Sequence, residues 1–132
     1  MRLKNSSGLP DDLVREVINF VKPTGVSKFS IDVKKANWSS GRAWTRGKRV
    51  MIKLNPKTKF PHKYDVQKGK GYLPSIQFTM TELLVHLVAH ELRHLWQETH
   101  KKGWRVWGSK GQFSERDADA YGIRMVRQWR RK

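Results

Sequence analysis

The 132-residue sequence contains no cysteine, no long apolar run and few acidic residues. The absence of cysteine excludes disulfide bonds, zinc sites built from thiolates and a cysteine nucleophile. No segment approaches the roughly 20 apolar residues of a membrane-spanning helix, and the N-terminus does not resemble the apolar core of a signal peptide. We therefore expect a cytoplasmic protein without a transmembrane segment. A chain of this length can build one hydrophobic core, which predicts a single domain over residues 1–132.

The scarcity of acidic residues leaves a large positive charge. The sequence has 28 Lys and Arg against 11 Asp and Glu, a formal net charge of +17. Basic residues dominate 17–81 and the tail 127–132, whereas most acids lie between Glu82 and Asp119. This polarity favours a polyanionic partner such as nucleic acid, an anionic membrane surface or an acidic protein. The alternative is a charged surface that only keeps the protein in solution.

The N-terminal half predicts one helix followed by strands. The segment Leu9–Val21 is predicted to be a helix, because Pro10 and two aspartates at its start are followed by apolar residues at helical spacing. Apolar and polar residues then alternate in 29–33 and in 50–54, with a short strand expected around 43–44 and turn residues between them. We predict a small antiparallel meander of three strands, with Ser75 to Phe78 as a fourth short strand. Residues 55–74 are predicted to form a long basic loop.

Two further helices are predicted in the C-terminal half. Thr79-Met80-Thr81-Glu82 matches a capping box, after which a strongly apolar helix should run from about Met80 to about Thr99. Ser114 is a suitable cap for a third helix that ends near Arg130. The fold class predicted from these elements is α+β.

The second helix contains His90-Glu91-Leu92-Arg93-His94, an H-E-x-x-H pattern. Histidines four residues apart lie one helical turn apart, so both imidazoles can reach the same zinc ion. Glu91 is placed to contact a water on that ion as a general base. The alternative is two histidines that core hydrogen bonds satisfy.

A catalytic zinc site needs a third protein ligand, and two residues compete for this role. His100 has the spacing of the longer H-E-x-x-H-x-x-G-x-x-H pattern, but Gln97 stands where that pattern has glycine. Glu115 opens the third helix and offers a carboxylate. Asp119, one turn later, is placed to accept a hydrogen bond from the Nδ1–H of a ligating imidazole. The spacing favours Glu115 and keeps His100 as the alternative.

At these residues the chain resembles the gluzincin group of zinc metallopeptidases, in which H-E-x-x-H is followed on a later helix by E-x-x-x-D. The segment Glu115-x-x-Ala118-Asp119-x-Tyr121-Gly122 looks like the third-ligand helix of small intracellular members of the ImmA/IrrE type. The resemblance implies a minimal zincin-like domain with one Zn²⁺ on His90, His94 and Glu115. It also implies Asp119 as the partner of a ligand, and hydrolysis of peptide bonds in a protein or peptide by a zinc-bound water, with Glu91 as general base.

Several residues carry weaker predictions. His86, Trp104 and Trp107 are candidates for lining the cleft, although a histidine such as His86 is more often simply packed at a helix edge. Trp38 and Trp44 alternate with arginines along the chain. Such tryptophans can stack on the bases of single-stranded nucleic acid, or they can be ordinary core residues. A nucleic-acid-binding module with a structural zinc and no hydrolytic activity is therefore the alternative function, and His100 or His86 would be its fourth ligand. A third reading is a domain of this fold that has lost proteolysis and binds a partner.

Overall fold

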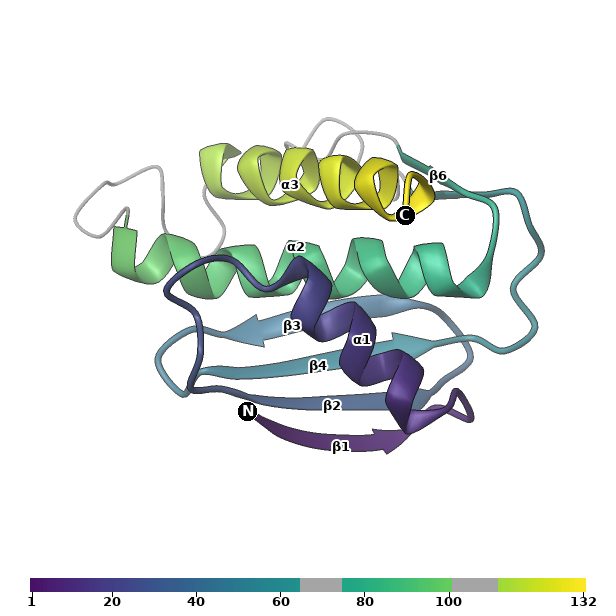
Figure 1. The fold of residues 1–132 in the computed structure, drawn as a ribbon, viewed down its shortest axis with the longest axis horizontal. Helices are drawn as coiled ribbons and strands as arrows, with labels where there is room; N and C mark the ends of the chain where they lie inside the picture. The colour runs from purple at the N-terminus through teal and green to yellow at the C-terminus, as the bar shows by residue number, and fades with distance from the viewer. Residues whose placement is uncertain (65–74, 101–111) are drawn as a thin grey trace.

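The computed structural model describes residues 1–64, 75–100 and 112–132 as an α+β fold (Figure 1). A four-stranded sheet and a two-stranded sheet combine with three helices. In chain order the elements are β1 (Arg2–Ser6), α1 (Asp11–Val21), β2 (Ser30–Lys35), β3 (Ser40–Trp44), β4 (Arg49–Leu54), β5 (His62–Tyr64), β6 (Ser75–Gln77), α2 (Met80–His100) and α3 (Gln112–Arg130). Within these ranges all three predicted helices are present, with bounds shifted by a few residues.

The predicted antiparallel meander is wrong, because the four-stranded sheet is mostly parallel. Its order is β1-β2-β4-β3, with β1 parallel to β2, β2 parallel to β4, and only β3 antiparallel to β4. Helix α1 connects β1 to β2 as a crossover, which makes these two strands parallel. The β3–β4 hairpin then folds back so that β4, and not β3, pairs with β2. The prediction had missed β1 and had assumed that neighbours in sequence are neighbours in the sheet.

The region predicted to be a long loop, 55–74, contains one strand of a second pairing. β5 pairs with β6 in antiparallel fashion, with His62 opposite Gln77. β6 confirms the short strand predicted after residue 74, whereas β5 was not predicted. The rest of that predicted loop, 65–74, lies outside the described residues.

The core lies between one face of the four-stranded sheet and the helices. Alternate residues of β2 and β4 point to this face and are buried, and α1 and α2 pack on them with their apolar sides. The buried side chains of the two strands and α1 are Ile31, Val33, Val50, Ile52, Leu54, Val14, Val17, Ile18 and Val21. Helix α2 is buried through most of its length, as its composition predicts, and α3 packs along it (Figure 1).

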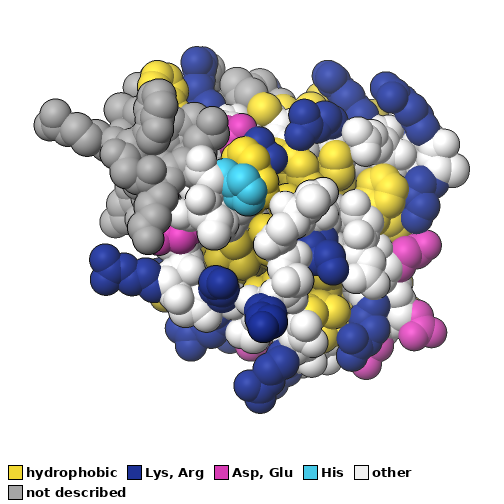
Figure 2. Space-filling view, turned by 60° about the vertical axis from the view of Figure 1, so that its left-hand side comes forward, with side chains coloured by type: hydrophobic (Ala, Val, Ile, Leu, Met, Phe, Trp, Pro, Cys, Tyr) yellow, Lys and Arg dark blue, Asp and Glu magenta, His cyan; other side chains and the backbone are white. Residues whose placement is uncertain are grey.

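Basic side chains are spread over the surface. Figure 2 shows Lys and Arg side chains around one face of the molecule, with hydrophobic side chains between them. Within the described ranges, none of the helices is both long enough and apolar enough to span a membrane.

The predicted capping box at the start of α2 is confirmed on the Thr79 side, whereas the Glu82 carboxylate binds the N–H of Phe78 in place of the N–H of Thr79. Thr79 Oγ1 accepts a hydrogen bond from the Glu82 backbone N–H at 3.1 Å. The Glu82 carboxylate reaches back to the N–H of Phe78 at 2.8 Å and also accepts two hydrogen bonds from Arg130, at 3.0 and 2.7 Å. Because Arg130 ends α3, this pair fastens α3 to the start of α2. The hydrogen bonds from Arg130 lower the pKa of Glu82 despite the opposing effect of burial.

Replacing Glu82 with glutamine is expected to destabilise the fold in a pH-dependent way. The change removes charge-assisted hydrogen bonds, so the free energy of unfolding at neutral pH should fall by about 1.5–3 kcal/mol. Since the folded pKa lies below the unfolded value, the wild-type advantage exists above about pH 4 and disappears as the pH falls further. Urea denaturation at several pH values measures this difference.

Glu16→Gln is the matched control for that measurement. Glu16 also pairs with a cation, Lys132, at 3.2 Å, but its side chain is 55% exposed. We expect this variant to change the free energy of unfolding by less than about 1 kcal/mol at any pH. An equal loss in both variants would show that the Glu82–Arg130 pair has no special role.

Candidate metal centre

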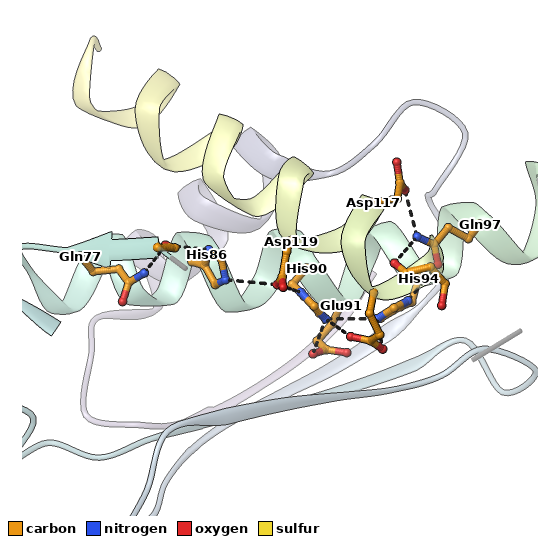
Figure 3. A network of polar contacts seen from close by, with 11 residues as sticks. Gln77, His86, His90, Glu91, His94, Gln97, Asp117 and Asp119 are labelled. Atoms are coloured by element: carbon orange, nitrogen blue, oxygen red, sulfur yellow. Dashed lines mark hydrogen bonds and ion pairs between the residues drawn. The ribbon is translucent and has the colours of Figure 1, made fainter. Parts of the chain in front are cut away.

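The candidate site forms where the middle of α2 meets the first turns of α3 (Figure 3). α2 carries His90, Glu91 and His94, and α3 carries Glu115 and Asp119. Four of these five residues are buried, and the Glu115 side chain is only 13% exposed. The structure therefore brings together the residues that the two sequence patterns single out.

A glycine allows the two helices to approach closely beside the site. A Cβ atom on Gly122 of α3 would lie 2.9 Å from Nδ1 of His86 and 3.2 Å from the backbone oxygen of that residue. Any side chain here would push α3 away from α2. Gly122, which belongs to the third-ligand segment in the sequence, thus helps to bring Glu115 and Asp119 within reach of the histidines.

Three groups converge on one point between the helices. The Nε2 atoms of His90 and His94 are 3.2 Å apart. The Glu115 carboxylate faces both, with Oε2 3.2 Å from His90 Nε2 and Oε1 3.3 Å from His94 Nε2. Donor atoms that share a tetrahedral ion at bond lengths of about 2.0–2.1 Å are separated by about 3.3 Å. The 3.2 Å between the two Nε2 atoms fits such an ion, and each carboxylate oxygen of Glu115 lies at a similar distance from one of the two nitrogens.

The other ring nitrogens are held by acceptors, which fixes the orientation of both imidazoles. His90 Nδ1 donates to Asp119 Oδ1 at 2.8 Å, and His94 Nδ1 donates to Gln97 Oε1 at 2.9 Å. The amide of Gln97 cannot be reversed without loss, because its nitrogen donates to the Ser114 carbonyl at 2.8 Å and to Asp117 at 2.9 Å. Each neutral imidazole therefore carries its hydrogen on Nδ1 and a lone pair on Nε2.

A cation between the two Nε2 atoms and the Glu115 carboxylate would stabilise this arrangement. Two Nε2 lone pairs and a carboxylate face one another at close range in a buried place, and Glu115 Oε2 is a buried oxygen without a well-formed hydrogen bond. Lone pairs directed at one another repel unless a proton or a metal ion lies between them. The second, independent sign is the acceptor behind each imidazole, which is the usual environment of metal-ligating histidines.

The pKa shifts of His90 and Glu115 also favour a positive charge at this position. Burial disfavours the charged form of His90, but the carboxylates of Glu91, Asp119 and Glu115 outweigh it and raise the pKa of His90 to about 10. Burial acts to raise the pKa of Glu115, but the neighbouring imidazoles of His90 and His94 outweigh burial and lower it. Without a metal the cluster thus retains a proton as its cation.

Glu91 lies beside this point and close enough to His90 and His94 to be a possible ligand, but it is farther from His90 Nε2 than Glu115 is. Its Oε2 is 4.0 Å from His90 Nε2, and burial raises its pKa above the ordinary value. The carboxylate points toward the sheet (Figure 3) and fills the space over Gly41 of β3, where a Cβ atom would lie 2.6 Å from Oε2. A buried carboxylate with a raised pKa, next to a cation site, is suited to accepting and returning a proton.

A second group of possible ligands lies on the other side of the His90 ring. His86, His90 and Asp119 are all buried, with His86 Nε2 3.8 Å and His90 Nδ1 2.8 Å from Asp119 Oδ1. The described residues therefore offer a metal ion two positions, one on each side of this ring. The 2.8 Å contact has the length of a hydrogen bond and is shorter than the separation of two ligands on one ion, so the Nε2 side fits a metal better.

A line of polar contacts extends from His86 to the smaller sheet. Nδ1 of His86 lies 3.3 Å from Ser75 Oγ, and Ser75 accepts a hydrogen bond from Gln77 (Figure 3). Gln77 Oε1 in turn lies 2.8 Å from His62 Nδ1. His86 is fully buried, and burial lowers its pKa to about 3. It is therefore a neutral, packed histidine, and the interpretation that it lines an open cleft finds no support in its burial.

The structure also shows where the remaining predicted residues lie. His100 stacks on Trp96 with ring centroids 4.5 Å apart, and its Nδ1 contacts the Trp96 carbonyl oxygen at 2.9 Å. It is thus engaged at the end of α2, while Glu115 lies against both histidines. Trp104 and Trp107, the other cleft candidates, lie outside the described residues.

Sequence reasoning missed the role of Gln97. It had counted only as a departure from the glycine of the longer histidine pattern, yet its side chain orients His94. One signal was available: Gln97 follows His94 by three residues on a helix, close enough for their side chains to meet. Its partners Ser114 and Asp117 come from α3 and could not be assigned without the fold.

Comparison of the chain with protein-family models, with curated proteins and with solved structures finds no match.

Proposed function

We propose that this protein is a zinc-dependent metallopeptidase in which His90, His94 and Glu115 hold the ion and Glu91 acts as general base. The observation that carries the proposal is the convergence of two Nε2 atoms and a carboxylate at separations of 3.2–3.3 Å, with Glu91 alongside. Two histidines and a glutamate are a ligand set of catalytic zinc, which leaves a fourth position open.

In the proposed hydrolysis, the metal ion and the side chains of the protein would have different roles. Bound zinc would polarise a carbonyl group and lower the pKa of a coordinated water. Asp119 and Gln97 keep the two imidazoles in the tautomer that directs Nε2 to the ion. Glu91 would take a proton from the attacking water at its carboxylate and pass that proton to the leaving amine, a role that its raised pKa supports.

The sheet suggests a peptide as the substrate. β3 is the edge strand of the four-stranded sheet and lies next to Glu91 through Gly41. An edge strand has backbone N–H and C=O groups on its outer side that an extended peptide can pair with. A peptide added there would run past the general base.

The alternative, a structural zinc in a nucleic-acid-binding module, needs a fourth protein ligand. Neither residue considered for it lies in the converging set: His86 is on the Nδ1 side of His90, and His100 is stacked on Trp96. These positions favour the open, catalytic arrangement.

Metal content and X-ray absorption spectroscopy test the proposal on protein purified without added zinc. We expect one zinc per chain, bound by two imidazole nitrogens and by oxygen donors that include one exchangeable with solvent. No bound metal, or four protein ligands and no exchangeable one, would contradict a catalytic site.

A further inference from the structure

The face of the four-stranded sheet that points away from the helices is basic. Along each strand, every second side chain points to this face, and these side chains are exposed or half-buried while their neighbours in β2 and β4 are buried. The strand pairing sets them in rows across the sheet. The charged residues on this face are Arg2, Lys4, Asp32, Lys34, Arg42, Arg49 and Lys53.

Six of those seven residues are cations, and their charges are not balanced locally. Asp32 is the single acid in the rows, next to Lys4 on β1 and Met51 on β4. An excess of like charge on a flat surface repels itself and raises the local concentration of a polyanion. Charge complementarity therefore points to a negatively charged polymer as the occupant of this face.

Two tryptophans lie among these cations. The guanidinium groups of Arg42 and Arg49 lie 4.8 and 4.3 Å from the ring centroid of Trp44. Trp38, just before β3, is 59% exposed, and the ammonium group of Lys53 lies 5.3 Å from its ring. Trp38 is thus not a core residue. An exposed indole among cations is the combination that stacks on a nucleobase while its neighbours contact phosphates.

We propose that this outer sheet face binds single-stranded nucleic acid, with Trp38 stacking on a base and Arg42 and Arg49 contacting phosphates. A duplex hides the faces of its bases, whereas a single strand exposes them to aromatic side chains. The face is distinct from the metal centre: Gly41 of β3 turns toward Glu91, and its neighbour Arg42 turns to the outer face. A bound strand would lie on the opposite side of β3 from the proposed general base.

Fluorescence anisotropy with a labelled oligothymidylate strand, and with a duplex of the same length, tests this inference on the full chain. We expect the single strand to bind more tightly than the duplex. Arg42→Gln/Arg49→Gln should reduce the slope of log affinity against log salt by about 1.4, which is the loss of two phosphate contacts. The matched control is Arg127→Gln/Arg131→Gln, which removes the same charge from exposed positions in the C-terminal tail and should leave the slope nearly unchanged.

A third variant separates stacking from charge. Trp38→Ala keeps the net charge and should weaken single-strand binding by about 5- to 150-fold, with little effect on the duplex. Circular dichroism checks that each variant is folded. Equal losses in the sheet and tail variants, no effect of Trp38→Ala, or binding to anionic vesicles but not to the oligonucleotide would each overturn the inference. None of these results depends on metal binding or hydrolysis.

Discussion

Glu91→Gln is expected to lower kcat/KM for peptide hydrolysis by about 10²- to 10⁴-fold while the protein keeps its zinc. Glutamine has nearly the same shape as glutamate, so the buried space over Gly41 stays filled. Its amide cannot accept the proton that the proposed mechanism gives to the carboxylate. Glu91 lies outside the converging set of His90, His94 and Glu115, so metal affinity should change little. Hydrolysis of a quenched fluorescent peptide and zinc content, measured on the same preparation, check both parts.

Glu98→Gln is the control for this result, because Glu98 is an exposed residue of the same helix and should be replaceable without loss. Unchanged hydrolysis in Glu91→Gln would contradict the general-base role. Loss of zinc together with activity would instead place Glu91 among the ligands.

Gly41 offers a second approach to the same carboxylate without altering it. In Gly41→Ala the new Cβ atom would meet Glu91 Oε2 at 2.6 Å, so the carboxylate must move. A displacement of about 1 Å can cost about 10²-fold in rate. Gly47→Ala is the matched control, since a Cβ atom there has no neighbour within 4 Å. Loss of activity in the first variant alone, with zinc retained, is the expected result.

The helices could be predicted from the sequence because their signals are local. The capping box of Thr79 and Glu82, and the apolar spacing of α1 and α2, involve residues within a few positions of one another. The sheet could not be predicted in the same way. Pairing of β2 with β4 depends on the crossover through α1 and on the fold-back of β3, and no alternation pattern records which strands become neighbours. β1 was missed because it has few apolar residues, with one half-buried leucine.

The candidate site, too, could be predicted where its residues are close in sequence, and could not where they depend on the packing of two helices. His90 and His94 lie one turn apart on a single helix, so their spacing alone predicts that they can converge. The approach of Glu115 was anticipated from a motif, but its distances to both imidazoles depend on the packing of α3 against α2 at Gly122. Gln97 shows what a sequence cannot supply, since its orientation is fixed by two acceptors on the other helix.

Glu115→Ala is expected to weaken zinc binding more than any change outside the converging set. The substitution removes the carboxylate whose two oxygens lie 3.2 and 3.3 Å from the Nε2 atoms of His90 and His94. Asp119→Asn, which weakens the hydrogen bond to His90 Nδ1 but leaves the three donor groups in place, should cost about 10- to 100-fold in affinity. Competition with a chromophoric chelator measures the dissociation constant for zinc in each variant, and circular dichroism checks the fold.

His100→Ala decides between the two candidates for the third ligand. If Glu115 is the ligand, this variant should bind zinc like the wild type, because His100 is held by Trp96 at the far end of α2. The order of affinities would then be wild type and His100→Ala, followed by Asp119→Asn, with Glu115→Ala weakest. A large loss in His100→Ala with little change in Glu115→Ala would reverse the assignment and favour the longer histidine pattern. Comparable losses in both variants would indicate four protein ligands, which leaves no open position for catalysis.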